Sequence, residues 1–245
     1  MRAVECRHLA RLPFQRPILD VGSGDGTFAR VLFNGVIVDA GIDADAAECA
    51  RAKRTRCYAE VRNCRVEALP FEPERFATVF SNCVLEHVPD VERALSEIHR
   101  VTRPEGRLYL TVPSPRCTSY LLWRRVLARL GLRGLAERYA NLTLRLFKAE
   151  TVLEADGWSE LLGRAGFAVE EHEPYMPLRA TRIQELFLPS GFLSVLAKAW
   201  LGRMLVFPRL HRLKVRAYRW LLRPAYAERA VEGSGSLIVA RKRAV

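Results

Sequence analysis

The sequence predicts an α/β protein with a doubly wound, mostly parallel sheet of seven strands and helices on both faces. Short apolar runs alternate along the chain with stretches of helical periodicity, which is the order expected of a parallel sheet. A glycine-rich turn follows the first apolar run, as at a strand that leads into a helix. The last run is expected to be the antiparallel edge strand that such sheets often carry.

The seven strands are expected at residues 18–21, 35–42, 64–67, 76–81, 106–112, 167–174 and 236–241. Helices are expected at residues 44–53 and 153–165, and Gly166 suits the C-terminal cap of the second. The spacing of these elements leaves two long segments, 118–147 and 178–232, outside the alternating order.

We expect a single domain over residues 1–245, a length that can bury a sizeable core and still carry additional elements. Its core would comprise residues 14–117, 148–177 and 233–245, and the two long segments would be basic helical insertions. Both insertions would flank the C-terminal edge of the sheet, where ligands bind in such folds. We expect the first insertion to form a helical lid.

The most informative segment, residues 18–29, reads ILDVGSGDGTFA. Glycines at 22, 24 and 26 let the backbone turn sharply and approach a ligand closely, and the positive end of the next helix faces the same place. The spacing is G-x-G-x-G rather than the G-x-G-x-x-G of dinucleotide sites. Asp20 would repel a phosphate and suits a cationic group such as an amine.

Asp43 stands about twenty residues beyond the first glycine, after a second apolar run. An acid at this position can hold both hydroxyls of a ribose, and it can also cap the helix that follows. Three further blocks come in order: VEALPF at 66–71, FATVFSNCVLEHVPD at 76–90 and IHRVTRPEGRLYLTVPSP at 98–115.

Together these blocks resemble the class I S-adenosylmethionine-dependent methyltransferases, and most of all their methyltransferase type 11-like family, over about residues 17–115. The resemblance implies a Rossmann-like fold and S-adenosyl-L-methionine as cofactor. It implies that Asp20 and the turn of Gly22, Ser23, Gly24 and Gly26 hold the methionyl end. It further implies a ribose contact at Asp43, adenine contacts at Ala44, Val66 and Glu67, and a lining of the methyl side by Asn82 and Cys83.

The chain departs from the family at two places. Arg65 stands where an acid usually meets the adenine amino group, and Glu67 is the nearest substitute, or else a solvated residue at a strand end. Residues 104–106 read Pro-Glu-Gly where the family usually has Pro-Gly-Gly. These departures put side-chain recognition of the adenine in question and leave the fold intact.

His87 is the only plausible general base in the motif region, and we expect it to be catalytic if the acceptor is a hydroxyl. Its alternative role is structural, bonded to the backbone near a helix start. No metal site is expected, because none of the six cysteines forms a C-x-x-C pair and no ligand cluster is evident. The cysteines are expected to be reduced thiols.

The formal charge of +12 is concentrated in the insertions, which hold +5 (residues 118–147) and +8 (residues 178–232), while the remainder holds −1. Arginines at 209, 212, 216, 219 and 223 form one helical stripe beside an apolar one, and an apolar segment, 191–207, precedes them. This combination over 191–223 predicts association with an anionic membrane surface. The alternative is a helix that packs its apolar face on the protein.

We therefore expect methyl transfer to a small-molecule acceptor that is lipid-like or membrane-linked. Two alternatives stay open, namely a soluble metabolite as acceptor and a non-catalytic, cofactor-binding membrane adaptor. Nucleic acid is an unlikely partner, because the Leu-rich segment has no base-stacking platform. No apolar run has the length of a signal peptide or of a spanning helix, so we expect a cytoplasmic protein at the inner face of the membrane. The oligomeric state stays open.

Overall fold

The computed structural model describes residues 2–147, 150–186, 208–227 and 230–243, so the segment 191–207 lies outside the described residues. The chain divides into two compact units. The sheet unit comprises residues 2–115, 147–174 and 235–245, and the insertion unit comprises Met1 with residues 116–146 and 175–234. The expectation of a single domain stays a prediction.

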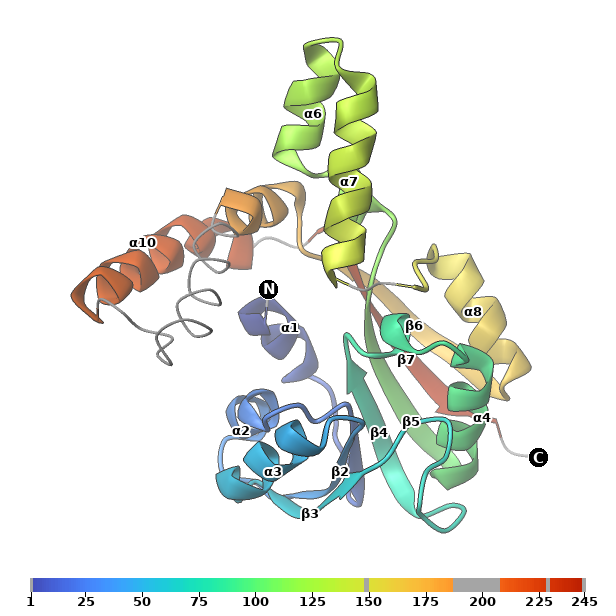
Figure 1. The fold of residues 1–245 in the computed structure, drawn as a ribbon. Coiled ribbons are helices and arrows are strands. Elements are labelled where there is room, and N and C mark those ends of the chain that lie inside the picture. The colour runs from blue at the N-terminus through green and yellow to red at the C-terminus, as the bar shows by residue number, and fades with distance from the viewer. Residues whose placement is uncertain (1, 148–149, 187–207, 228–229, 244–245) are drawn as a thin grey trace. The chain divides into compact units, whose positions relative to one another are not determined.

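The sheet has seven strands in the order β3-β2-β1-β4-β5-β7-β6 (Figure 1). The strands are β1 (Ile18–Val21), β2 (Val38–Asp43), β3 (Tyr58–Asn63), β4 (Phe76–Asn82), β5 (Thr102–Pro113), β6 (Phe167–Tyr175) and β7 (Gly235–Lys242). Strands β1 to β5 pair in parallel, whereas β7 is antiparallel to β5. The predicted fold class, a doubly wound and mostly parallel sheet, is therefore confirmed.

Two strand predictions were wrong in detail. The third strand runs over Tyr58–Asn63 and not over 64–67, because an edge strand with only one buried residue carries a mixed sequence that gives no apolar run. Strand β7 is antiparallel as expected but lies between β5 and β6, not at the edge. An interior place suits its residues, since Leu237, Ile238 and Ala240 are at most 1% exposed.

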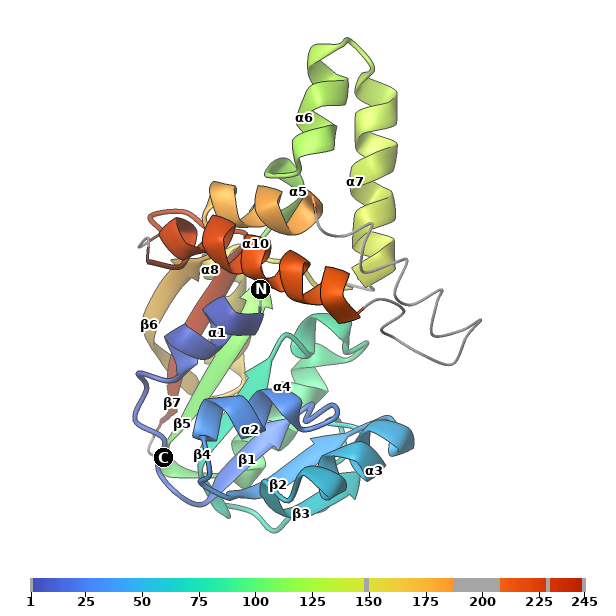
Figure 2. The same cartoon turned by 90° about the vertical axis from the view of Figure 1, so that its left-hand side faces the viewer.

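Helices cover both faces of the sheet. The sheet unit contains α1 (Arg2–Leu9), α2 (Thr27–Phe33), α3 (Ala46–Thr55), the 3-10 turn η1 (Leu85–His87), α4 (Val91–Val101) and α8 (Ala155–Arg164). Figures 1 and 2 show α4 and α8 on one face and α1, α2 and α3 on the other. Gly166 follows α8 with a φ of +90°, as a cap position requires.

The insertion unit is helical, as predicted. It contains α5 (Arg116–Ser119), α6 (Leu122–Arg129), α7 (Arg133–Phe147), helical residues 178–186 and α10 (Pro208–Ala227). Helices α6 and α7 run antiparallel side by side in both views, and an ion pair of 2.8 Å joins Arg124 to Glu137 between them (Figures 1 and 2).

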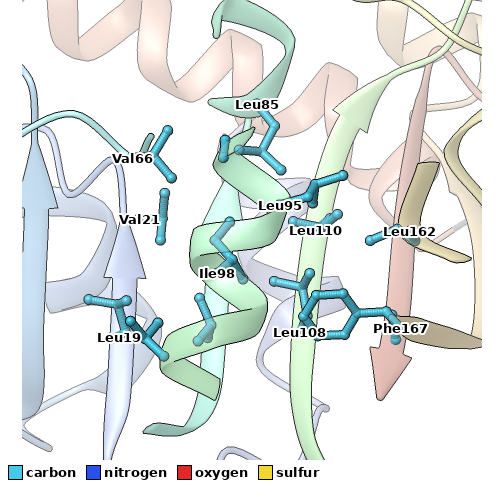
Figure 3. Close-up of a cluster of buried hydrophobic side chains, with 14 of the residues drawn as sticks. Leu19, Val21, Val66, Leu85, Leu95, Ile98, Leu108, Leu110, Leu162 and Phe167 are labelled. Carbon is cyan, nitrogen blue, oxygen red and sulfur yellow. The ribbon is translucent and has the colours of Figure 1, made fainter. Parts of the chain in front are cut away.

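The main core of the sheet unit lies between the sheet and the face covered by α4 and α8. Figure 3 shows Leu95 and Ile98 of α4 against the side chains of β1 and β5, with Phe167 of β6 beside Leu162 of α8. These four side chains are fully buried. Burial of each such side chain stabilises the fold by about 1.5–3 kcal/mol relative to its exposure. This layer therefore fixes the strands of the sheet.

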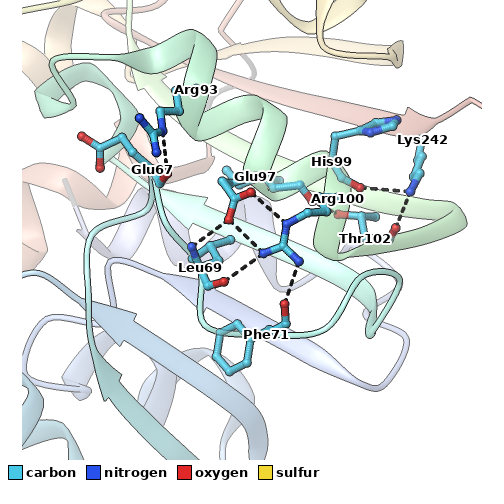
Figure 4. Close-up of polar contacts among 10 residues, drawn as sticks. Glu67, Leu69, Phe71, Arg93, Glu97, His99, Arg100, Thr102 and Lys242 are labelled. Carbon is cyan, nitrogen blue, oxygen red and sulfur yellow. Dashed lines mark hydrogen bonds and ion pairs between the residues drawn. The ribbon is translucent and has the colours of Figure 1, made fainter.

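A polar cluster on α4 fixes the loop between β3 and β4 (Figure 4). Arg100 donates to the carbonyls of Phe71 (2.7 Å) and Leu69 (2.9 Å), and Glu97 accepts from the Leu69 N–H at 2.8 Å. The Arg100 guanidinium also holds the pKa of Glu97 below its usual range. Arg93 donates to the carbonyl of Glu67 at 3.0 Å. This clamp positions residues 66–71, which include two of the predicted site residues.

We predict that Arg100→Met lowers the free energy of unfolding by about 1–3 kcal/mol, because the carbonyls of Leu69 and Phe71 lose a charged donor. Urea denaturation at neutral pH measures this loss. Arg54→Met, at an exposed position on α3, is the matched control and should leave stability within about 0.5 kcal/mol of the parent. Equal losses in both variants would contradict the assigned role of the clamp.

Candidate active site

The glycine turn connects β1 to α2 at the C-terminal end of the sheet. Gly22 has a φ of +82° and Gly26 a φ of +77°, conformations that side chains disfavour. A Cβ at Gly22 would lie 2.2 Å from Cγ2 of Val84, so no larger residue fits there. The N–H groups of Gly22 and Ser23 both donate to the carbonyl of Ile42, at 2.9 and 2.8 Å. The backbone of the turn is thus held in place, and a ligand can approach it closely.

Asp20 is a buried acid just before this turn, with 3% of its surface exposed. The hydroxyl of Tyr58 donates to its Oδ2 at 2.6 Å. Burial raises the pKa of Asp20 to about 7, and the nearby Asp43 adds to the rise, although the Tyr58 bond and Arg2 oppose it. A cationic ligand at this carboxylate would offset the cost of burying its charge.

Asp43 ends β2 and faces the same turn. Its Oδ2 accepts from the N–H of Gly24 and its Oδ1 from the N–H of Asp45, each at 2.9 Å. The capping role considered for Asp43 was wrong, because Asp45 caps α3 by accepting from Ala47 at 2.7 Å. The helix accordingly begins two residues later than predicted. Ala44 lies exposed between the two acids.

The buried hydroxyl of Ser23 has no hydrogen-bond partner among the described residues. Ser23 is 5% exposed and lies in the middle of the glycine turn. Buried polar groups are nearly always paired, so an unpaired one in a ligand-binding turn indicates a missing polar partner.

Val66 and Glu67 occupy the clamped loop after β3. The side chain of Val66 packs into the main core beside Val21, which leaves its backbone as the group available to a ligand (Figure 3). The carboxylate of Glu67 pairs with Arg65. Arg65, which stands where the family usually has an acid, thus pairs with Glu67, the acid considered as its substitute.

Asn82 and Cys83 end β4 and lie in a buried polar network. Thr111 on β5 donates to Oδ1 of Asn82 at 2.8 Å, and Nδ2 of Asn82 donates to Glu5 at 3.1 Å. Cys83 has a φ of +55° and its N–H donates to the Thr111 carbonyl at 2.9 Å. The strained residue therefore lies directly after the strand end, where functional residues often occur.

Two acids that the sequence analysis did not single out belong to this site. Glu5, on α1, is fully buried beside Asn82 and Cys83. Glu86 is 3% exposed, and its Oε2 has no hydrogen-bond partner within the described part of the chain. Burial raises the pKa of Glu86 to about 7, with a further contribution from Glu5. Its position before His87 in an apolar stretch was the available signal, whereas nothing in the local sequence marks Glu5.

His87 lies on η1 with 41% of its side chain exposed, and its Nε2 is 3.8 Å from Oε1 of Glu86. The acids at 5, 20 and 86 give the C-terminal ends of β1 and β4 a buried lining of carboxyl groups. Among the described residues no group of three His, Cys, Asp or Glu side chains could hold a metal ion. The arrangement suits an organic cation.

Comparison with known proteins identifies a methyltransferase domain in the same part of the chain. Residues 19–110 match the family described as methyltransferase domain. The chain is 31% identical over 132 residues to malonyl-[acyl-carrier protein] O-methyltransferase of Halorhodospira halophila, a match that covers 51% of this chain and 44% of that protein. It is 30% identical over 112 residues to ubiquinone biosynthesis O-methyltransferase of Pseudomonas entomophila, covering 44% and 48%.

These matches therefore span less than half the length of either relative. Among solved structures, phosphoethanolamine N-methyltransferase 2 of Haemonchus contortus in complex with S-adenosyl-L-methionine shares the fold. Its TM-score is 0.60 at 17% identity, covering 99% of this chain and 52% of that one.

Three observations test whether the residues fit S-adenosylmethionine: Gly22 tolerates no Cβ, burial raises the pKa of Asp20, and the buried hydroxyl of Ser23, next to Gly22, has no partner among the described residues. The cofactor has an amino group and a sulfonium as cations and several polar groups as hydrogen-bond partners, so the residues fit. Residues 19–110 therefore form a class I S-adenosylmethionine-dependent methyltransferase domain.

Proposed function

We propose that this domain transfers a methyl group from S-adenosylmethionine to a small-molecule acceptor that is lipid-like or membrane-linked. The observation that carries the methyl-donor half is the buried carboxylate of Asp20 beside the glycine turn. The acceptor half is supported by the charge of the insertions and by the apolar side chains that they expose.

In this proposal Asp20 and the backbone of Gly22, Ser23 and Gly24 hold the methionyl end, with Gly26 completing the turn. Asp43 holds the ribose, Ala44 and the backbone of Val66 lie along the adenine with Glu67 at its edge, and Asn82 and Cys83 line the methyl side. The bound cofactor supplies an electrophilic methyl group on a positively charged sulfur. Holding the acceptor in line with that methyl contributes on the order of 7–11 kcal/mol.

A hydroxyl acceptor also needs a group to take its proton. His87 has an exposed ring, and the neighbouring carboxylate of Glu86 lies 3.8 Å from Nε2, where it would stabilise the protonated ring. We assign His87 as the general base and Glu86 as the residue that positions and stabilises it.

The membrane part of the proposal has support in α10. Within the described side chains of this helix, Arg216, Arg219 and Arg223 are exposed, and Trp220 is 75% exposed. No helix in the described ranges is both long enough and apolar enough to cross a bilayer. A peripheral position at the inner face of the membrane, over residues 191–223, is consistent with this surface.

A second candidate is a cofactor-binding membrane adaptor without catalysis. The observation that favours it is the Arg65–Glu67 ion pair, which replaces the usual acid near the adenine. Tight cofactor binding without turnover on any acceptor would support this candidate.

The test of the acceptor class compares paired acceptors that share one phenolic head group and differ in the presence of an isoprenoid tail. We expect kcat/KM to be at least tenfold higher for the tailed acceptor presented in vesicles, because apolar burial of the tail contributes to binding. Transfer of radiolabelled methyl groups measures both rates. Equal rates for the two acceptors would favour a soluble metabolite.

We predict that affinity for S-adenosylmethionine rises with pH up to about pH 7, because Asp20, with its pKa of about 7, must lose its proton to attract the cation. Below that pH the affinity should fall about tenfold per unit, and binding should release protons. Calorimetry in buffers of different ionisation enthalpy measures both effects.

Asp20→Asn should weaken binding and flatten this pH dependence, leaving only the share of Glu86. Asp39→Asn is the matched control on the neighbouring strand. Asp39 accepts from Arg16 and from the Ile18 N–H at 2.8 Å, so its loss should reduce stability and leave the pH dependence unchanged. A pH-independent affinity in the parent protein would contradict the role of Asp20.

We predict that His87→Gln lowers kcat on a hydroxyl acceptor by about 10²- to 10⁴-fold and leaves cofactor affinity unchanged. Glu86→Gln should lower kcat less and shift the acidic limb of the pH–rate profile. Stopped assays across pH, with cofactor titration of each variant, measure these effects. An unchanged kcat in His87→Gln would give His87 the structural role instead.

A further inference from the structure

The turn between α6 and α7 exposes three leucines at the tip of the hairpin. Leu130 is 68% exposed, and Leu132 and Leu135 are each 50% exposed. Single exposed leucines are common on protein surfaces, but three within six residues at one tip are a concentrated apolar surface. We name residues 129–135 the apical turn.

We propose that the apical turn docks on an anionic membrane, with its leucines among the lipid chains and its arginines at the phosphates. The inference gives the proposed function a second contact with the membrane, apart from α10. The biological role of this docking rests on the proposed function, whereas the docking itself can be measured without turnover.

Packing of the hairpin does not require these leucines. Other side chains fill the inner face of α7, where Ala136 is 1% and Ala140 is 3% exposed. Val126 and Leu127 are half-buried on α6. The apical leucines therefore contribute little to the fold, and their exposure has a cost in water that contact with lipid would remove.

The backbone at the end of α6 is closed by hydrogen bonds. Gly131, with a φ of +79°, donates to the carbonyl of Ala128 at 3.1 Å, and Leu132 donates to that of Leu127 at 2.9 Å. These two bonds form a Schellman motif that closes the end of α6. A helix end closed in this way brings fewer unpaired backbone groups into the interfacial region of a bilayer.

The charges around the tip match an anionic surface. Arg129 precedes the leucines and Arg133 lies between Leu132 and Leu135. Arg125 on α6 and Arg138 on α7 lie further from the tip, and all four arginines are exposed. The single acid of the hairpin sequence, Glu137, pairs with Arg124. Helix α7 also begins with an arginine and has no acid in its first turn, the reverse of what its dipole favours. Lipid phosphates at the tip would correct this local imbalance.

The base of the hairpin is held by Glu185, which lies on the second insertion and is 3% exposed. Its carboxylate accepts from the N–H groups of Leu122 and Trp123 and from the hydroxyl of Tyr139, the last at 2.7 Å. The contact ties α6 and α7 together at the end opposite the tip. The apical turn is therefore presented on a fixed base.

A membrane fits these observations better than a nucleic acid or a protein. A nucleic acid would use the arginines and leave the leucines in water. A protein partner would need a surface larger than one turn, whereas a bilayer accepts a small apolar tip ringed by cations.

The experiment is cosedimentation of the full chain with vesicles of phosphatidylcholine, with and without phosphatidylglycerol, at low and high salt. We expect binding to the anionic vesicles that weakens with salt. The triple variant Leu130→Ser, Leu132→Ser, Leu135→Ser should reduce binding at least tenfold. The double variant Arg129→Gln, Arg133→Gln should reduce it about fivefold for each arginine removed.

Two matched controls remove equivalent groups from the sheet unit. The triple variant Val31→Ser, Val36→Ser, Ile37→Ser replaces apolar side chains that are 61%, 52% and 47% exposed. The double variant Lys53→Gln, Arg54→Gln removes two exposed cations from α3. Both should bind anionic vesicles as the parent does. Circular dichroism and titration with S-adenosylmethionine verify that each variant is folded.

The proposal is overturned if the apical leucine variant binds as the parent does, or if the matched control loses as much. It is also overturned if binding is lost only in the α10 variant Arg216→Gln, Arg219→Gln, Arg223→Gln, or if the chain retains RNA and no vesicles. Intact vesicle binding with no affinity for S-adenosylmethionine would uphold docking and count against the proposed function.

Discussion

The carboxylate of Asp20 is the constraint on which the rest of the site depends. It is buried at the end of β1, and its pKa of about 7 reflects the cost of keeping a charge there without a cation. The turn after it is held by backbone bonds to Ile42 and by the Asp43 carboxylate, so the strand ends cannot shift to relieve that cost. A cationic methyl donor at this carboxylate would offset that cost, and cofactor affinity would then depend on the ionisation of Asp20.

The same logic extends to the methyl side. Glu5 is buried beside Asn82, Glu86 is buried near Glu5 and Cys83, and burial raises the pKa of Glu86 as it does that of Asp20. The site therefore contains more buried carboxyl groups than the family resemblance alone implies. A positively charged sulfur would favour their ionised forms, and the carboxyl group of Glu86 lies beside His87, the candidate base.

The features that could be predicted from the sequence are those determined by residues close together in the chain. Glycines that need positive φ, a strand end followed by an acid and a long apolar helix face each leave a local pattern, and the turn at Gly22 lies where that pattern predicts it. Strand β3 was missed because only one of its residues is buried, so its sequence contains no apolar run. The interior place of β7 depends on pairing with β5, a contact across more than a hundred residues that no local pattern encodes. Glu5 was missed for the same reason, since its burial arises only when α1 folds against the strand ends.

The carboxylate of Glu185 has a consequence for how the protein is made and how it evolves. The two insertions are separated in the chain by α8 and β6, yet the start of α6 completes its hydrogen bonds only with a residue from the second of them. During synthesis the first hairpin must wait for that later segment before its base is secured. Loss of either insertion alone would leave a buried acid or two amide groups unmatched, which favours their gain or loss as a pair.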